Sequence, residues 1–596
     1  MKTYKIEKYV TLIVSLLSLN ACNSDWLDPK PLSILVPENT FINAEGFEGA
    51  LTTCRKQLKH EFYGDCKGNA TEFMFSDLAV NGLTESDRPH NMDIQITPNG
   101  VGECKVKWFW EYCYDGIKYA NIVISRIGDA EWKSEDEKNR ILGEGYFHRA
   151  YYFYRLVHQY GDVPWVGEEI TSPRLDFKTY SRAAILDKIK RDLEFSVKWI
   201  PENVEPGQVN RAAANFLLTK VYLSLGLFDD AIKSASEIIN DGIHVMMTER
   251  FGQGRYYDRS EFNVVWDLHQ RENKSLLENK EAILVVQDKY GYEGCTDGTW
   301  AMRDFEPMYH WAPVKAPNGK AGTSDSGAEG SPGRVWADSV GRGLGRVRPC
   351  PYFTTTIWAN CNDDLRHCKE NWFDITDFVY NNVSAEEWYM EKIPMEHIQA
   401  MGVDTIRTLF AFPFYKVNIP DELRLERKPG GNSDWYVFRL AEVYLLRAEA
   451  YWWKNDLINA AKDINIVRTR AKADPISASG VTIDYIFDER ARELYAEEPR
   501  KTELTRVAYI MASLSRDGYT LKTMHQKNWY YDRVIRCNFF YRENILNYSN
   551  IYKMSPFHVY WPIPQNAIDA NAQNVINQNY GYIGEENRQE PVNLIE

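Results

Sequence analysis

Two short sets of residues, far apart in the chain, have the same spacing. The first set is Tyr222, Gly226, Phe228 and Ala231, and the second is Tyr451, Asn455, Leu457 and Ala460. An aromatic residue, a turn residue, a second apolar anchor and a small contact residue at these intervals join two antiparallel helices. Because the two sets match in register, the chain is predicted to contain stacked helical pairs.

Other segments carry apolar residues at helical spacing. They cover residues 108–129, 141–160, 210–240 and 434–473, followed by one further helix over 484–513. A Gly161-Asp162-Val163-Pro164 turn ends the second of these segments. Together with the repeated spacing, they predict a mainly α fold in which tetratricopeptide-like helical pairs form a scaffold.

The middle of the chain, from Asn273 to Arg348, has a different character. Residues 281–287 form a short apolar run typical of a strand, and glycine, proline and serine cluster over residues 317–346. The segment is also rich in tyrosine and tryptophan, whereas a disordered segment is poor in aromatic residues. We therefore expect a loop-rich, irregular but ordered layer on the helical scaffold.

The N-terminus has the pattern of a secretion signal. Three lysines fall within the first eight residues, residues 9–19 are almost wholly apolar, and Leu19-Asn20-Ala21-Cys22 resembles a lipobox. The apolar run is too short to be a membrane-spanning anchor, because a helix needs ~20 residues to cross the hydrocarbon core of a bilayer. We predict that Cys22 is lipidated; an ordinary signal peptide beside a cysteine is the alternative.

Length alone allows several domains, but the pattern favours one domain after the leader. Residues 1–21 are predicted to be the signal peptide and residues 22–596 a single domain. Its expected parts are an N-terminal helical half at 22–270, a loop-rich variable layer at 271–433, and a C-terminal helical half with its tail at 434–596.

Composition limits the partners and cofactors. The formal net charge is −14, which argues against nucleic acid because phosphate binding requires a basic surface. Ten cysteines are present, and their spacing contains no pair of pairs of the zinc-binding type. Since one of them is Cys22, an odd number remains and at least one thiol is expected to stay free. No cofactor or metal is predicted, and the sequence does not determine whether structural calcium binds.

The sequence contains no convincing catalytic site. Gly341, Gly343 and Gly345 superficially resemble a phosphate loop, but no strand precedes them and no Lys-Ser or Lys-Thr pair follows, so a flexible loop is the simpler interpretation. The close carboxylates Glu493 and Glu497 have arginine and lysine neighbours in the sequence. Opposite charges lower a carboxyl pKa, which is the wrong direction for a general acid. We predict an ion-pair network and no enzymatic activity.

Seven blocks in a fixed order carry a resemblance that spans nearly the whole mature chain. They are Leu27-Asp28-Pro29-Lys30-Pro31; Trp110, Tyr114, Ile117, Ala120 and Asn121; Arg149-Ala150-Tyr151-Tyr152-Phe153 with Gly161-Asp162-Val163-Pro164; Asp364 and Arg366; Arg439-Leu440-Ala441-Glu442-Val443-Tyr444-Leu445 with Ala448-Glu449-Ala450; Glu489-Arg490, Glu493-Leu494, Glu498, Arg500 and Leu504; and Pro562-Ile563-Pro564 with Gln578-Asn579-Tyr580-Gly581-Tyr582. They resemble the RagB/SusD family, the lipoproteins that accompany TonB-dependent transporters in Bacteroidetes. Tyr580 is a minor departure, since the family commonly has proline or a similar residue there.

The resemblance implies a fold, a function and a location. The fold would be a SusD-like α-α superhelix with an irregular ligand face. Such proteins act as lids on a β-barrel importer, a SusC-like TonB-dependent transporter, and capture oligosaccharides or polysaccharides without breaking bonds. The chain would be attached to the outer membrane through lipid on Cys22 and would face the cell exterior. Peptide capture by the same kind of importer, or a tetratricopeptide scaffold that binds proteins, are the alternatives.

Candidate ligand-binding residues follow from the chemistry of sugar recognition. Aromatic rings pack on the apolar face of a pyranose, while carboxylates, amides and guanidinium groups pair with its hydroxyls. The aromatic candidates are Tyr292, Trp300, Tyr309, Trp311 and Trp336. The polar candidates are Asp297, Arg303 and Asp304 in the variable layer, with Asp87, Arg88 and Asn91 in an early loop. For each ring, the alternative is a small local core that only fixes the loop.

Overall fold

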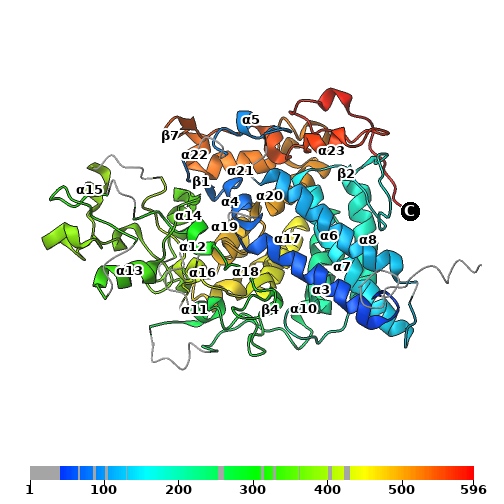
Figure 1. Cartoon of the computed structure of the whole chain (residues 1–596), viewed down its shortest axis with the longest axis horizontal. Coiled ribbons are helices and arrows are strands. Elements are labelled where there is room, and N and C mark those ends of the chain that lie inside the picture. The colour runs from blue at the N-terminus through cyan, green and yellow to red at the C-terminus, as the bar shows by residue number, and fades with distance from the viewer. Residues whose placement is uncertain are drawn as a thin grey trace, which may run out of the picture.

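The computed structural model describes most of the chain. The described residues are 40–64, 68–84, 89–100, 105–128, 130–252, 261–310, 314–325, 330–361, 363–400, 406–421 and 430–596. The leader and Cys22 therefore lie outside them, as do Asp87, Arg88 and Trp311. Long helices dominate the described chain, and its strands form two-stranded antiparallel sheets (Figure 1). The prediction of a mainly α fold is confirmed.

Four long helices build one side of the molecule. They are α3 (Ala44–Phe62), α6 (Val106–Arg126), α7 (Glu135–Gln159) and α8 (Arg182–Trp199). Side chains of Asn43, Ser134 and Ser181 accept hydrogen bonds from backbone N–H groups at the starts of α3, α7 and α8. Such caps satisfy donors that the first helical turn leaves unpaired, and so fix where each helix begins. In Figure 1 these helices lie together at the right.

Both repeats found in the sequence are helical pairs. The first joins α9 (Arg211–Ser224) to α10 (Phe228–Ile239), and the second joins α17 (Leu440–Trp453) to α18 (Leu457–Arg470). Gly226 and Asn455 occupy the same place in the two turns, with φ of 74° and 62°. Glycine and asparagine tolerate this left-handed conformation better than other residues. The pairs pack against each other through α10 and α17, so the predicted stacking is confirmed.

Two predicted helix boundaries are wrong. The segment from residue 434 begins with strand β6 (Trp435–Arg439), which pairs with β4 (Ala282–Val286), the strand that the sequence did predict. The single helix expected over 484–513 is two helices, α19 (Ile483–Leu494) and α20 (Arg500–Ser513). Ala496 has a φ of 62°, and Pro499 precedes α20. Because proline lacks an N–H and restricts the residue before it, a helix cannot run through this turn without disruption.

Shorter elements complete the fold. The helices are α4 (Gly68–Met74), α5 (Met92–Gln95), α11 (Val264–His269), α12 (Ala301–Phe305), α13 (Pro332–Val340), α14 (Pro351–Thr354), α15 (Met395–Ala400), α16 (Phe414–Val417), α21 (Trp529–Cys537), α22 (Phe539–Arg542) and α23 (Gln565–Asp569). The strands are β1 (Ala79–Asn81) with β5 (Val347–Pro349), β2 (Val163–Pro164) with β3 (Thr179–Tyr180), and β7 (Leu546–Asn547) with β8 (Asn550–Ile551).

The apolar core is divided between a large body and a smaller lobe. The main cluster joins residues from both helical halves, for example Phe216 and Phe438, whose ring centroids are 4.1 Å apart. A separate cluster is formed by Tyr309, Val314, Ala337, Phe378, Tyr380, Ile393 and their neighbours. We call the described residues within 309–340 and 373–409 the outer lobe. It contains α13 and α15 and lies at the left of Figure 1.

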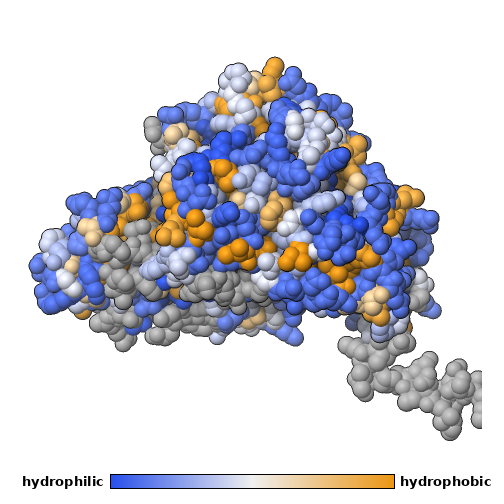
Figure 2. All heavy atoms as spheres, turned by 90° about the horizontal axis from the view of Figure 1, so that it is seen from above, coloured by the Kyte–Doolittle hydropathy of each residue, from blue (hydrophilic) through white to orange (hydrophobic). Residues whose placement is uncertain are grey.

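The surface carries little continuous apolar area on the face seen from above. Figure 2 shows that face as mostly hydrophilic, with apolar side chains in separate small patches. Within the described residues, no helix has both the length and the apolar character needed to span a membrane. Every described cysteine is a free thiol, whereas Cys66 and Cys104 lie outside the described residues. Lipid attachment at Cys22 stays a prediction.

Candidate functional site

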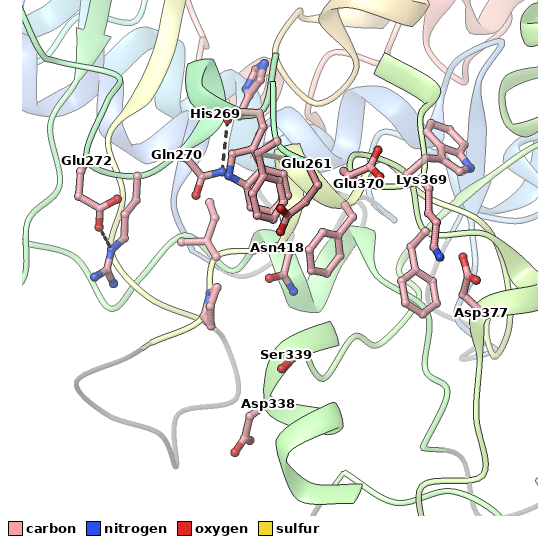
Figure 3. A pocket seen from close by; sticks show the side chains of 18 of the residues that line it. Glu261, His269, Gln270, Glu272, Asp338, Ser339, Lys369, Glu370, Asp377 and Asn418 are labelled. Atoms are coloured by element: carbon pink, nitrogen blue, oxygen red, sulfur yellow. Dashed lines mark hydrogen bonds and ion pairs between the residues drawn. The ribbon is translucent and has the colours of Figure 1, made fainter. Parts of the chain in front are cut away.

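A cleft of about 870 Å³ lies between the helical body and the outer lobe. Residues of α11, α13 and α16 line it, together with residues 369–377 (Figure 3). Its size falls within the range of roughly 300–1,000 Å³ that is usual for ligand pockets. Both an aromatic wall and a set of polar groups reach this space, so we take it as the candidate site.

Four rings form the aromatic wall of the cleft. Asn263 begins α11: its side chain accepts hydrogen bonds from the backbone nitrogens of Val265 and Trp266, at 3.1 and 3.2 Å. This cap fixes the short helix that carries Trp266, whose ring stacks on Phe262 with centroids 4.1 Å apart. Phe414, at the start of α16, lies 6.1 Å from Trp266 and 6.3 Å from Phe373. The rings therefore form a continuous surface drawn from three separate segments.

Polar side chains surround this wall. In Figure 3, Gln270 and Glu272 lie at one end of the cleft, Lys369 and Asp377 at the other, and Asn418 between them. The α13 helix contributes its own polar groups from the facing side. Acidic residues outnumber basic ones in the lining, which contains Glu261, Glu272, Asp338, Glu370 and Asp377 against Arg271 and Lys369. Such a balance disfavours anionic ligands.

Two groups in the cleft wall are held in a neutral, buried state. Burial lowers the pKa of His269 well below its ordinary value, and the charges of Lys416 and Arg439 add to the shift. Trp372 is 5% exposed, and its indole nitrogen has no hydrogen-bond partner among the described residues. A buried donor without a partner is costly, so this nitrogen destabilises the wall slightly and does not itself contact the cleft space.

The predicted segment around Trp300 lies behind the cleft and does not line it. Trp300 precedes α12 with a φ of 58°, and the guanidinium of Arg346 lies 5.8 Å from its ring. Arg346 also forms a buried ion pair with Asp304, at 2.8 Å. Arg303 donates to the backbone oxygen of Arg342 at 2.5 Å. Because Asp304 is buried and paired with Arg346, we do not expect it to contact a ligand directly.

Tyr309 and Trp336 belong to the core of the outer lobe. The Tyr309 side chain is 2% exposed, and its ring meets the edge of Trp336 with centroids 4.8 Å apart. One side of α13 thus packs Trp336 into the lobe, while Asp338 and Ser339 line the cleft. The prediction that Tyr309 forms a surface platform is wrong, because its ring is closed off from solvent. Both rings instead belong to a small local core, which was the alternative given for each aromatic candidate.

The remaining predicted residues are spread over the molecule. Tyr292 is 72% exposed, and Asp297 is exposed as well. Asn91 begins α5, which lies at the top of Figure 1, whereas α11, α13 and α16 lie at the lower left. Asp87, Arg88 and Trp311 are outside the described residues. The structure does not bring this set together, and ligand binding by its exposed members stays a prediction.

Sequence reasoning missed the aromatic wall. Phe262 and Trp266 fall before the predicted loop-rich layer, and Phe414 lies near its end in a run of apolar residues that could equally be core. Asn263 was a usable signal, because asparagine at a helix start caps the first turn, and an aromatic residue just before the cap can pack against one in that turn, as Phe262 does on Trp266. Only the packing of α11 against α16 turns these separate rings into one surface.

The carboxylates of α19 and of the turn that follows it form the predicted ion-pair network. Glu493 contacts Arg366 and Arg439 at 3.0 and 2.7 Å, and it also pairs with Arg470. Burial alone would raise the pKa of Glu493, but the nearby arginines lower it well below its ordinary value. Glu497 pairs with Arg439 at 2.8 Å. These acids are structural, as the sequence indicated.

Comparisons with known proteins identify the family. The SusD family profile matches residues 280–582, and a second profile, described as "Starch-binding associating with outer membrane", matches residues 25–223. The chain is similar to SusD-like protein P25 of Formosa agariphila, with 22% identity over 96% of this chain and 97% of that protein. It is also similar to SusD-like protein P2 of the same organism, with 28% identity over 40% of this chain and 47% of that protein.

A solved structure has the same fold. Surface glycan-binding protein A from Bacteroides thetaiotaomicron, in complex with laminarihexaose, matches with a TM-score of 0.61 and 16% identity, over 91% of this chain and 100% of that one. At this identity the likeness establishes the fold alone. The profile matches, which together span most of the chain, agree with the order of blocks read from the sequence. This chain belongs to the SusD family.

Proposed function

We propose that this protein is a cell-surface lipoprotein that binds oligosaccharides in the cleft between α11, α13 and α16. It passes them to a partner TonB-dependent, SusC-like outer membrane transporter and does not cleave them. The observation that carries the proposal is the aromatic wall of Phe262, Trp266, Phe373 and Phe414 opposite a polar rim.

The physical chemistry of the cleft suits a sugar. A pyranose offers an apolar face to an aromatic ring, and its edge carries hydroxyls that pair with amides and carboxylates. Trp266 and Phe414 supply rings, while Gln270, Asp377 and Asn418 supply polar groups. The matched profiles and the name of the laminarihexaose-bound relative point to the same class of ligand.

The absence of cleavage is supported by the state of the carboxylates on α19. A glycosidase needs one carboxyl group whose pKa is raised so that it can donate a proton. Glu489 and Glu493 instead have lowered pKa values, that of Glu489 about 2, because arginines outweigh the effect of burial. These residues are buried within the helical body, where their ion pairs with arginines hold its helices together.

Membership of the family supports attachment and delivery as parts of the proposal. One matched profile is described as associating with the outer membrane, and the predicted lipid on Cys22 would provide the tether. A lipid-held receptor stays beside its transporter, which raises its effective concentration there. Because the cleft is open and shallow enough to leave part of a ligand in water, affinity should be modest and release rapid.

Binding to immobilised polysaccharides tests the proposal. The mature chain without lipid should be retained by at least one member of a panel that includes laminarin and starch. Trp266→Ala should reduce retention about tenfold, equivalent to ~1.4 kcal/mol, because a ring of the platform is lost. Trp199→Ala is the matched control, since Trp199 ends α8 away from the cleft.

The outcomes separate the alternatives. Loss of retention for Trp266→Ala alone supports glycan capture in this cleft. Retention of peptides with no retention of any glycan would instead favour peptide capture. For delivery, the lipidated chain extracted in mild detergent should co-purify with a TonB-dependent barrel protein. Recovery of the chain without any barrel would contradict the transport part of the proposal.

A further inference from the structure

Behind the cleft lies a buried glutamate that no predicted role explains. Glu306 follows α12 and is 1% exposed. Its Oε1 accepts a hydrogen bond from Nδ2 of Asn418 at 3.0 Å. Its Oε2 is buried and has no hydrogen-bond partner within the described residues. Among the described residues, the side chain that is hydrogen-bonded to the Glu306 carboxyl is therefore that of Asn418, which lines the cleft.

Asn418 is placed between the glutamate and the cleft. It ends α16, where its backbone N–H donates to the oxygen of Phe414 at 3.0 Å. Its side chain is half-buried and lies in the middle of the cleft in Figure 3. Glu306 takes one of the two N–H donors of Nδ2, and this places the carbonyl oxygen Oδ1 on the other side of the amide, where it makes no hydrogen bond to the described residues and is left to accept from a ligand. A carbonyl oxygen can only accept.

The glycines that superficially resembled a phosphate loop enclose Glu306. The N–H of Gly345 donates to the backbone oxygen of Glu306 at 2.8 Å, and the N–H of Leu344 donates to that of Arg303 at 2.9 Å. Gly341 has a φ of 88°, and a Cβ there would lie 1.7 Å from Oε2 of Glu306. A Cβ on Gly343 would lie 2.1 Å from the backbone oxygen of Glu306. The segment is a loop, as expected from the sequence, but most of it is buried and packed closely against Glu306.

The Glu306 carboxyl is suited to orienting an amide without adding charge. Burial raises its pKa well above the ordinary value, and the hydrogen bond from Asn418 opposes this shift only in part. Burial therefore favours the neutral, protonated form of this carboxyl. An ionised carboxylate here would project its charge into a cleft whose lining is already acidic. A neutral carboxyl orients Asn418 at a smaller electrostatic cost.

We propose that Glu306, enclosed by the Gly341–Gly345 loop, is a positioning residue that fixes Asn418 with Oδ1 facing the cleft. In this arrangement Oδ1 accepts a hydrogen bond from a ligand hydroxyl. A ligand carboxylate placed against Oδ1 would be repelled there, so acidic oligosaccharides are disfavoured. The inference deepens the proposed glycan binding and rests on it for the identity of the ligand. The orientation of Asn418 can be measured without any ligand.

A double-mutant cycle measures whether Glu306 acts through Asn418. The variants are Glu306→Leu, which removes the acceptor, Glu306→Gln, which keeps a carbonyl acceptor of similar size, Asn418→Ala, and the Leu/Ala double variant. The probe is laminarihexaose, titrated calorimetrically against the mature chain. We expect Glu306→Leu and Asn418→Ala each to weaken binding about fivefold, with Glu306→Gln within about twofold of the unchanged protein. In the Asn418→Ala background, Glu306→Leu should have no further effect.

Additive losses in the cycle would overturn the inference, because they would mean that Glu306 supports the cleft generally. So would unchanged affinity in Asn418→Ala, a half-buried position that can be tested even if Glu306→Leu fails to fold. Hexagalacturonate is the second probe. It should bind at least about tenfold more weakly than laminarihexaose, and tighter binding of the acidic oligosaccharide would contradict the assigned orientation.

The ligand-free readout separates this inference from the proposed function. Selective ¹⁵N labelling of asparagine, with Asn418 assigned through Asn418→Ala, reports its side-chain amide directly. Glu306→Leu should shift this signal and speed its hydrogen exchange, whereas Glu306→Gln should leave both close to those of the unchanged protein. If no glycan binds but this pattern appears, the proposed function fails and the positioning role stands. If the signal is unaffected by Glu306→Leu, the positioning role fails even when glycans bind.

Discussion

Glu493, in the C-terminal helical half, and Glu306, behind the cleft, are both buried but stabilised in opposite ways. Glu493 contacts Arg366 and Arg439 at 3.0 and 2.7 Å, and the arginines lower its pKa. Among the described residues, the Glu306 carboxyl accepts one hydrogen bond, from Asn418, and burial raises its pKa. The arginines favour the charged form of Glu493, whereas burial favours the neutral form of Glu306.

This difference matches what the two regions do. In the body, paired charges join α17, α18 and α19 and tolerate burial only because every member has a partner. Beside the cleft, a neutral group can orient an amide without placing a charge near the ligand. We therefore expect the body to be sensitive to deletion of a partner, and the cleft to be sensitive to pH and to steric change.

The largest expected effect comes from breaking the charged network. Glu493→Ala leaves Arg366, Arg439 and Arg470 without one of their shared carboxylates, so the free energy of unfolding should fall by about 3–5 kcal/mol. Glu272→Ala is the control, because its pair with Arg271 is partly exposed and should contribute only about 0–1 kcal/mol. Urea denaturation measures both. Equal losses of unfolding free energy in the two variants would contradict the stabilising role assigned to the buried network.

A steric change should disturb the enclosure of Glu306. Gly341→Ala places a Cβ 1.7 Å from Oε2 of Glu306 in a backbone with a φ of 88°, so we expect a loss of about 2–3 kcal/mol in unfolding free energy. Gly49→Ala is a matched control, because Gly49 lies in α3 with open space around it. That change should stabilise slightly, by up to ~1 kcal/mol. If Gly341→Ala left the free energy of unfolding unchanged, the loop would be able to shift and accommodate the added Cβ at little cost.

Opposite pKa shifts predict opposite pH dependence. A carboxyl with a raised folded pKa contributes stability that is complete below its unfolded pKa and lost as pH rises through the folded value. Glu306→Gln removes this loss. Above about pH 4.5, the free energy of unfolding of the variant should therefore rise relative to that of the unchanged protein, by up to ~1.4 kcal/mol per pH unit. Glu489, with its pKa lowered to about 2, contributes stability present above its unfolded pKa and lost as pH falls toward 2. Denaturation midpoints from pH 4 to 9 for Glu306→Gln test the first sign; a constant offset would contradict it.

The smallest expected effect concerns the aromatic residues chosen from the sequence. Trp300 is half-buried behind the cleft wall, so Trp300→Ala should weaken laminarin retention less than about threefold. Trp266→Ala should exceed it because its ring faces the cleft. If Trp300→Ala abolished retention while Trp266→Ala did not, the ligand face would lie near Trp300, as the sequence predicted. Affinity electrophoresis in laminarin gels compares the two variants directly.

The scaffold could be predicted because its signals are local. The turn at Gly226, the matching turn at Asn455 and the small buried contacts at Ala231 and Ala460 are fixed by spacing within about ten residues. One failure occurs where the pairing partner is distant, since Trp435–Arg439 is a strand because β4 lies beside it. The break before Arg500 is a different failure, because Pro499 is a local helix-end signal that the apolar periodicity obscured.

By itself, the sequence determined the helical pairs, the ion-paired character of the α19 carboxylates and the family, because periodicity, charge neighbours and block order are written along the chain. Only the tertiary structure decided which rings face a ligand. Phe262, Phe373 and Phe414 meet across long stretches of sequence, whereas Tyr309 turned out to be core. Whether an aromatic ring is exposed depends on the segments that pack against it, and a distant contact leaves no periodic trace in the chain.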